Sequence, residues 1–381
     1  MMTATSITVQ DLMMAAPRLE VQLALVAIQA VFWYVALSHL LPPYFARVIN
    51  SMKSRERFLD NSAKSYKKLF TLDFNGDREQ LFEFTVLFQC IATQHMVAGL
   101  LCLPSVLGCS WVSPPVASAL ACHGALCEVG WEIQDFLVRL KEIAFDGESG
   151  RKKNPASFMA VLIMHHTVAQ CLVLPLNLYY RDNVYYHEAV LLLQAATVVA
   201  MLCQSYGFTL DVSLPAERRQ MTVSVTLAFC VALWARGLRY AYIWYVLLTA
   251  FLADGNIFVL KMALVPVVMF SLFNIVVVAD FYRKFAKFAL ALGRKADARS
   301  TKSDESCSSQ MLERHVTAVQ DVQPAAHSCE TAGRKWSEIP AAVAHPQRCS
   351  RTSRPMLRRG LAAHTHPARA SLTRAMPAST L

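Results

Sequence analysis

The chain of 381 residues is 55% hydrophobic and has a mean hydropathy of +0.33, which an ordinary soluble protein of this length rarely reaches. Its formal net charge of +10 is typical of nucleic-acid binding, but the excess of Lys and Arg falls wholly from Arg283 onward. A basic segment at the end of a membrane protein more often meets anionic lipid headgroups. The composition therefore predicts a membrane protein with lipid partners and no nucleic-acid partner.

Seven segments are long and apolar enough, or nearly so, to cross a bilayer as helices, which takes about 20 apolar residues each. In chain order they are residues 21–42, 82–108, 115–140, 156–180, 186–208, 221–250 and 257–282. The third is the least apolar because it carries several charged residues. The sequence thus predicts an all-α polytopic membrane protein with about seven transmembrane helices.

Basic residues alternate between the predicted loops. The loops after the first, third and fifth segments are rich in Lys and Arg, whereas those after the second, fourth and sixth contain only Arg181. The positive-inside rule places the basic loops and the C-terminus in the cytosol, and the N-terminus on the lumenal or extracellular side. This alternation favours seven spans over six, because six would put the C-terminal part opposite the basic loops.

The predicted spans divide the chain into three parts. Residues 1–79 hold the first helix and a basic cytosolic loop, and residues 80–290 form a six-helix transmembrane domain. Residues 291–381 are basic, rich in Ser, Ala, Pro and Arg, and poor in large apolar side chains. We expect this tail to be disordered and to meet anionic lipid headgroups, since it cannot bury enough apolar surface to offset its chain entropy.

Charged residues occur inside two of the predicted helices. Glu128, Glu132 and Asp135 follow one another at steps of four and three residues, so they share one helix face. Each such group costs about 2.5–3.5 kcal/mol at membrane depth and therefore usually faces the protein interior or a water-filled cavity. Arg236 and Arg239 share a face of the sixth helix, which predicts at least one Arg–carboxylate pair between the two helices. The alternative is that such pairs only hold the bundle together.

Histidines also lie within the predicted spans. His165 and His166 are adjacent in the fourth helix, and His95 lies in the second. Neighbouring helical residues point about 100° apart, so only one of the pair can point fully into a central groove. Sets of histidine and carboxylate can bind metal or shuttle protons. No His-Glu-x-x-His motif is present, and the sequence predicts neither a metal site nor a cofactor. His187 and Glu188, at a helix start, are expected to be solvated.

Several fragments together resemble the TLC domain, the module shared by ceramide synthases, translocation-associated membrane proteins and related lipid proteins. The resemblance covers roughly residues 80–285. Its fragments are residues 89–99 around His95, residues 164–167 with the His-His pair, Arg236 in the penultimate helix, and residues 272–274 and 280–284 in the final helix. The resemblance implies a TLC-like helical bundle in the endoplasmic reticulum.

The chain departs from the ceramide synthases at one position. In those enzymes the His-His helix is followed by a helix with a His-Asp pair and a further Asp. Residues 191–197 here read Leu-Leu-Leu-Gln-Ala-Ala-Thr, with Gln194 in place of the acid. Because glutamine cannot act as a base, the resemblance implies a non-synthase member linked to membrane-lipid composition, sensing or transport.

Three functions follow from these patterns. In the first, the chain is no enzyme, and it serves membrane lipid homeostasis by binding or sensing a lipid, such as a sphingolipid, in a polar cavity. The residues expected to line that cavity are His95, Glu128, Glu132, Asp135, Gln194, Arg236, Arg239 and Asn274. In the second, it is an acyl-CoA-dependent N-acyltransferase of the ceramide synthase type, with His165 and His166 catalytic and acyl-CoA as co-substrate. The third is a seven-helix receptor or proton-coupled transporter, although no two similar halves are visible.

Overall fold

The computed structural model describes residues 6–290, and these residues form helices without any strand. The α-helices are α1 (Val9–Met13), α2 (Leu19–Val35), α3 (Pro42–Ser51), α4 (Arg55–Phe70), α5 (Arg78–Val106), α6 (Pro114–Phe145), α7 (Gly147–Lys153), α8 (Ala156–Tyr179), α9 (Val184–Thr209), α10 (Pro215–Ala232), α11 (Arg239–Ala253) and α12 (Ile257–Phe285). Three π-helical segments continue them, namely η1 (Ala36–Leu40), η2 (Leu233–Leu238) and η3 (Ala286–Leu290). The all-helical prediction is therefore confirmed, whereas the predicted tail lies outside the described residues.

Six helical stretches within the described residues are long and apolar enough to cross a membrane, which is typical of an integral membrane protein. They are Leu19–Ser51, Arg78–Val106, Ala156–Tyr179, Val184–Thr209, Pro215–Ala253 and Ile257–Ala289. Helix α6 is not among them, although its 32 residues would extend about 48 Å at the usual rise per residue. Its polar residues lower its hydropathy, so length and composition support six spans rather than the seven expected.

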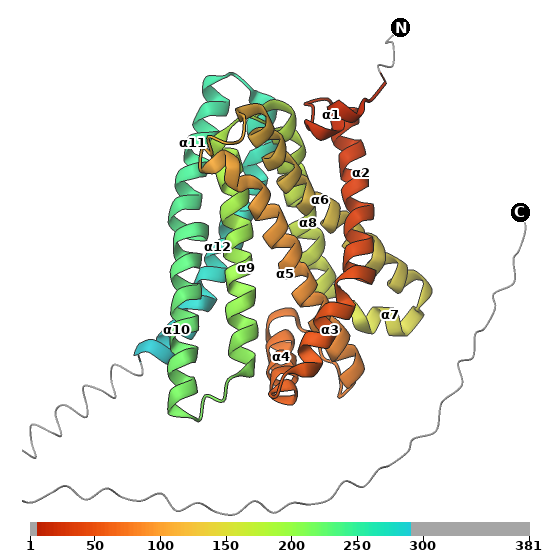
Figure 1. Cartoon of the computed structure of the whole chain (residues 1–381), viewed down its shortest axis with the longest axis vertical. Helices are drawn as coiled ribbons and strands as arrows, with labels where there is room; N and C mark the ends of the chain where they lie inside the picture. Colours follow the sequence, from red (N-terminus) through yellow and green to blue (C-terminus); the bar gives the residue numbers. More distant parts are fainter. Residues whose placement is uncertain (1–5, 291–381) are drawn as a thin grey trace, which may run out of the picture. The chain divides into compact units, whose positions relative to one another are not determined.

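Six helical rods close into a ring, each packing against the next. Helix α5 packs against α6, α6 against α8, α8 against α12, α12 against α10, α10 against α9, and α9 back against α5. Figure 1 shows α10 and α11 as one continuous rod beside α9, with η2 joining them. Helix α2 packs on the outer side of this ring, mainly against α6. The ring therefore turns one face of each member toward a shared interior.

Several helices begin where the sequence supplies a cap. The side chains of Asp77, Asn183 and Asn256 accept hydrogen bonds from backbone N–H groups at the starts of α5, α9 and α12. Pro114 and Pro215 stand in the first turns of α6 and α10, where a proline costs no helical hydrogen bond. These local signals set the register of the long helices and so the faces they turn inward.

Two glycines let α6 approach its neighbours closely. A Cβ atom at Gly130 would lie 2.4 Å from the Cβ of Gln29 on α2. A Cβ atom at Gly124 would lie 2.6 Å from the carbonyl oxygen of Ala98 on α5. Small residues are the usual means by which helices in membranes reach such short separations. Helix α6 is thus fixed between α2 and α5: Gly130 meets α2 on the face opposite Glu128, whereas Gly124, one turn before Glu128, meets α5 on the same side as that carboxylate.

The basic segment expected to be a cytosolic loop is helical and packed. Helix α4 lies against α5 and α9. The ring of Tyr66 is fully buried and lies 4.9 Å from the ring of Phe84, centroid to centroid. Asn61 donates a hydrogen bond of 3.0 Å to the carbonyl of Phe208 at the end of α9. The charged side chains of this segment therefore form the outer face of an amphipathic helix.

Candidate functional site

A cavity lies inside the helix ring and has one polar end. Its volume is about 90 Å³, which equals the space of about three water molecules in the liquid. The polar groups that line it are His95, Glu128, His165, Gln194, Thr197 and Arg236. The rest of its wall is made mainly of aliphatic and aromatic side chains, with Leu172, Val173, Leu176, Tyr186, Val190, Leu193, Trp244 and Phe270 among its residues. The cavity thus offers polar partners at one end and hydrocarbon along its length.

Glu128 is a carboxylate in the cavity wall, and several hydrogen-bond donors surround it. Gln94 and Gln194 donate from their side-chain amides to the same oxygen, Oε2, at 3.1 and 2.9 Å. His95 places its Nδ1 at 3.2 Å from that oxygen and donates to the Oε1 of Gln194 at 2.5 Å. Gln194 therefore serves as a donor that fixes Glu128. Gln94 is a site residue that sequence reasoning did not single out.

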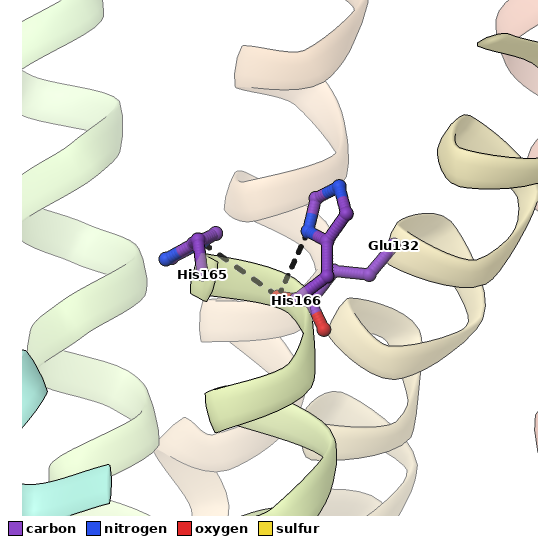
Figure 2. A group of neighbouring side chains, drawn as sticks. All are labelled: Glu132, His165 and His166. Carbon is purple, nitrogen blue, oxygen red and sulfur yellow. Dashed lines mark ion pairs between the residues drawn. The ribbon is translucent and has the colours of Figure 1, made fainter. Parts of the chain in front are cut away.

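Glu132 lies one turn further along α6 and faces the histidine pair of α8. Its Oε1 lies 3.7 Å from the Nε2 of His165 and 3.5 Å from the Nδ1 of His166 (Figure 2). Its side chain is fully buried, and neither carboxylate oxygen has a hydrogen-bond partner among the described residues. His165 lines the cavity, whereas His166 lies behind it and is buried. The two imidazoles thus take different positions, as their angular separation predicts.

Asp135 belongs to a separate layer of the same helix face. The Nε of Arg139 donates to both of its carboxylate oxygens, at 3.0 and 2.9 Å, and Arg139 also donates to Asn154 at 2.9 Å. The Nε2 of His166 lies 3.4 Å from the Oδ2 of Asp135. Arg139 stands four residues after Asp135, so the ordinary spacing of helical ion pairs was the signal that could have identified it.

Arg236 takes its partners from α9 and α12 rather than from α6. It lies in the π-helical segment η2 and donates to the Oδ1 of Asn274 at 2.9 Å, to the carbonyl of Leu193 at 3.3 Å, and to the hydroxyl of Thr197. Asn274 is only 1% exposed and stands behind the guanidinium. Hydrogen bonds to uncharged oxygen atoms thus hold Arg236 at the cavity wall.

The predicted ion pair between the third and sixth helices is wrong. Arg239 pairs instead with Glu188 on α9, with bonds of 2.7 and 2.8 Å from its Nε and Nη2. Its guanidinium lies 4.8 Å from the centre of the Tyr242 ring, and it does not line the cavity. The π-turns of η2 hold more residues than α-turns, so Arg239 does not share the direction of Arg236. Arg239 is therefore no member of this site.

His187 also differs from the expectation of a solvated side chain. It is 1% exposed, and its two ring nitrogens lie 2.6 Å from the hydroxyl of Ser105 and 2.6 Å from the carbonyl of Arg181. The loop before α9 folds over it and uses the imidazole to satisfy a backbone carbonyl. Glu188, its neighbour, is held by the ion pair with Arg239. Both residues support the fold next to the site.

His165 is the group with the widest chemical range in the cavity. Its Nε2 lies 3.7 Å from Glu132 and 4.0 Å from Glu128, and its ring packs against those of Phe270 and Phe273. An imidazole between carboxylates can accept or deliver a proton, bind a metal ion, or donate a hydrogen bond to a ligand. The arrangement therefore permits proton transfer as well as ligand binding.

No protein-family model matches the chain, and neither a curated protein nor a solved structure matches it. The TLC resemblance therefore stays a prediction from the sequence. What the chain does must be argued from the geometry of this cavity and of the helices around it.

Proposed function

We propose that the chain is a seven-helix, TLC-like membrane protein that binds or senses a lipid in this cavity and thereby serves membrane lipid homeostasis. One observation carries the proposal: the cavity has polar groups at one end and apolar side chains along the rest of its wall. A membrane lipid has the same division into a polar head and an apolar chain. A volume of about 90 Å³ suits a small head or part of one, with the chain leaving between helices.

Helix α6 supplies the seventh span in this proposal. Its carboxylates Glu128, Glu132 and Asp135 are all buried within the bundle, so a crossing α6 would not expose them to lipid. Seven spans and the basic loops favour a lumenal N-terminus and a cytosolic C-terminus. The TLC resemblance favours the endoplasmic reticulum, and the basic tail favours contact with anionic headgroups.

The charges of the cavity favour a head with both a donor and an acidic or acceptor part. Glu128 and Arg236 line the same cavity, yet no ion pair joins them among the described residues. A carboxylate and a guanidinium held apart leave room for a ligand that bridges them. An amine or hydroxyl would meet Glu128, and a phosphate or carbonyl would meet Arg236.

The proposal is tested by the lipids that stay bound to the purified protein. The full chain and its Arg236→Met variant are extracted in mild detergent, and bound lipids are identified by native mass spectrometry. We expect a defined lipid class on the wild type and at least about a tenfold loss in the variant, because a charged hydrogen bond in the cavity is removed. Arg239→Met is the matched control, since it removes an arginine three residues away that does not line the cavity. No retained lipid on the wild type, or equal losses in both variants, contradicts the proposal.

N-Acyl transfer from acyl-CoA is a second candidate, favoured by the position of His165. That imidazole lines the cavity and lies within 4.0 Å of two carboxylates, which suits a general base. Acyl-CoA turnover with a sphingoid base would support this candidate. Activity that is absent in the wild type, or that survives His165→Ala and His166→Ala, would reject it.

A further inference from the structure

Glu132, His165 and His166 make up a group of potential metal ligands that the sequence did not predict. Each offers one ligand atom, and the three atoms lie within 4.8 Å of one another. The adjacent histidines come from α8 and the carboxylate from α6, so the set exists only after the helices pack. Figure 2 marks an ion pair from each imidazole to the carboxylate of Glu132. We infer that these three residues bind a divalent transition-metal ion, with zinc as the ion that the ligand set favours.

The spacing of the ligand atoms fits this ion. Bonds of about 2.1 Å at tetrahedral angles place ligand atoms about 3.4 Å apart. The oxygen Oε1 of Glu132 lies 3.5 Å from the Nδ1 of His166 and 3.7 Å from the Nε2 of His165. The two imidazole nitrogens lie within 4.8 Å of each other, so a small closing movement of one ring completes the site.

Unpartnered atoms at the centre of the group are the second argument. Both carboxylate oxygens of Glu132 and the Nδ1 of His166 are buried without a hydrogen-bond partner among the described residues. A buried polar group without a partner costs free energy, and a buried carboxylate costs the most. A bound cation removes that cost for the Nδ1 of His166 and for the ligating oxygen of Glu132, and it neutralises the charge of the whole carboxylate.

The surroundings of His166 are those of a metal ligand. Its other nitrogen, Nε2, lies 3.4 Å from Asp135, and Asp135 is held on both oxygens by Arg139. Ligating histidines almost always direct their second nitrogen to a carboxylate or carbonyl, which fixes the ring and its tautomer. The Asp135–Arg139 pair therefore orients His166 with Nδ1 toward Glu132.

The ligand set selects the kind of ion and leaves one position open. Two imidazoles and one carboxylate are ligands that zinc and ferrous iron take, with water or a substrate in a further position. His165 lines the lipid cavity, so the open position lies at the cavity edge, where an oxygen of a lipid head or a water molecule completes the coordination. Metal binding would also engage Nε2 of His165 and so exclude its use as a free base.

Metal content of the full chain, purified without a polyhistidine tag, tests the inference. Inductively coupled plasma mass spectrometry is expected to find about one equivalent of zinc or iron per chain. Glu132→Gln keeps the shape of the side chain and is expected to retain less than about a fifth of the metal. Glu188→Gln is the matched control, because that carboxylate pairs with Arg239 outside the group. Metal-free wild type that also takes up no added zinc, or full metal content in Glu132→Gln, overturns the inference.

A second readout keeps the test valid if a variant folds poorly. Zinc added to metal-stripped wild type at about a hundred times its dissociation constant should raise the melting temperature by about 5 °C, since it binds only the folded state. Glu132→Gln should show no such rise. If that variant is instead more stable than the wild type whether or not zinc is present, Glu132 is a bare buried acid and the site does not exist. Lipid content is measured separately, so either result leaves the test of lipid binding intact.

Discussion

At the scale of single residues, the cavity depends on how one buried carboxylate is held. Glu128 receives two amide donors, from Gln94 and Gln194, and stands beside the imidazole of His95. A carboxylate in apolar surroundings is stable only with such partners. Gln194 therefore stabilises the site, because its amide donates a hydrogen bond to this carboxylate.

Replacing Gln194 by leucine tests this role. The variant removes the donor to Glu128 and the acceptor of His95, so we expect a loss of about 1.5–3 kcal/mol of unfolding free energy. Gln89→Leu is the control, because Gln89 donates to the neutral hydroxyl of Ser205 at 2.8 Å and should lose only about 0.6 kcal/mol. Reversible unfolding in mixed micelles measures both. Equal losses would mean that the Glu128 network adds no special stability.

At the scale of elements, the packing of α6 sets the direction of every carboxylate in the site. Gly130 and Gly124 bring it against α2 and α5 at separations that leave no room for a Cβ atom. The face opposite Gly130 carries Glu128 and Glu132 and looks toward α5, α8 and α9. The site is thus a consequence of two helix contacts that lie outside the cavity.

A methyl group at Gly130 should loosen this arrangement. Gly130→Ala puts a Cβ atom 2.4 Å from the Cβ of Gln29, so the helices must separate, at a cost of about 1–3 kcal/mol. Gly237→Ala is the control: its Cβ atom would meet only the Cδ1 of Leu233, at an ordinary 3.7 Å, and stability should change by less than about 1 kcal/mol. Thermal melting in detergent compares the two. A neutral Gly130→Ala variant would show that α2 and α6 are not in close contact.

The attachment of α4 to the end of α9 should depend on pH. The side chain and backbone of Ser213, and then Arg57 at 3.4 Å, lower the pKa of Asp211 below its usual value of about 3.9. A lowered pKa in the folded state means that Asp211 stabilises this contact above its unfolded pKa and ceases to do so as the pH falls through its folded pKa.

Hydrogen exchange of α4 at a series of pH values measures this dependence. After correction for intrinsic rates, protection of residues 55–70 should fall below a pH of about 4 in the wild type. Asp211→Asn should show lower protection at neutral pH and a weaker dependence in the acid range. The same acid dependence in both proteins would assign it to another group.

The sequence predicted the long helices well, because length and hydropathy are properties of one segment at a time. It also placed Glu128, Glu132 and Asp135 on one buried face. It did not predict the partner of Arg239, because a helix face does not reveal its neighbour and the π-helical η2 shifts the phase after Arg236. Nor could it predict the group of Glu132, His165 and His166, since adjacent histidines carry no ligand spacing and the carboxylate comes from another helix.

At the scale of the whole molecule, the number of crossings decides the sides on which the two ends lie. Six stretches of the described residues are apolar enough to cross, and the proposal adds α6. With seven crossings the ends lie on opposite sides of the membrane; with six they share a side. Helix α6 carries the carboxylates of the site, so a crossing α6 would place them at membrane depth.

Glycosylation acceptors at the two ends test the number of crossings. An Asn-x-Ser acceptor in an added N-terminal tag should be glycosylated in microsomes, whereas one in a C-terminal tag should not. An acceptor in a linker inserted after Gly255, between α11 and α12, is the control and should also be modified. Modification of both terminal tags, or of neither, would place them on one side and contradict seven spans.

The central claim is that the helix ring holds a lipid head in its polar cavity. An electron cryomicroscopy map of the full chain in lipid nanodiscs tests it most directly. The account predicts density for a lipid with its head between Glu128 and Arg236 and its chain along the apolar wall of α8 and α9. A map in which this space holds only side chains or water, with lipids confined to the outer surface of the ring, would contradict it.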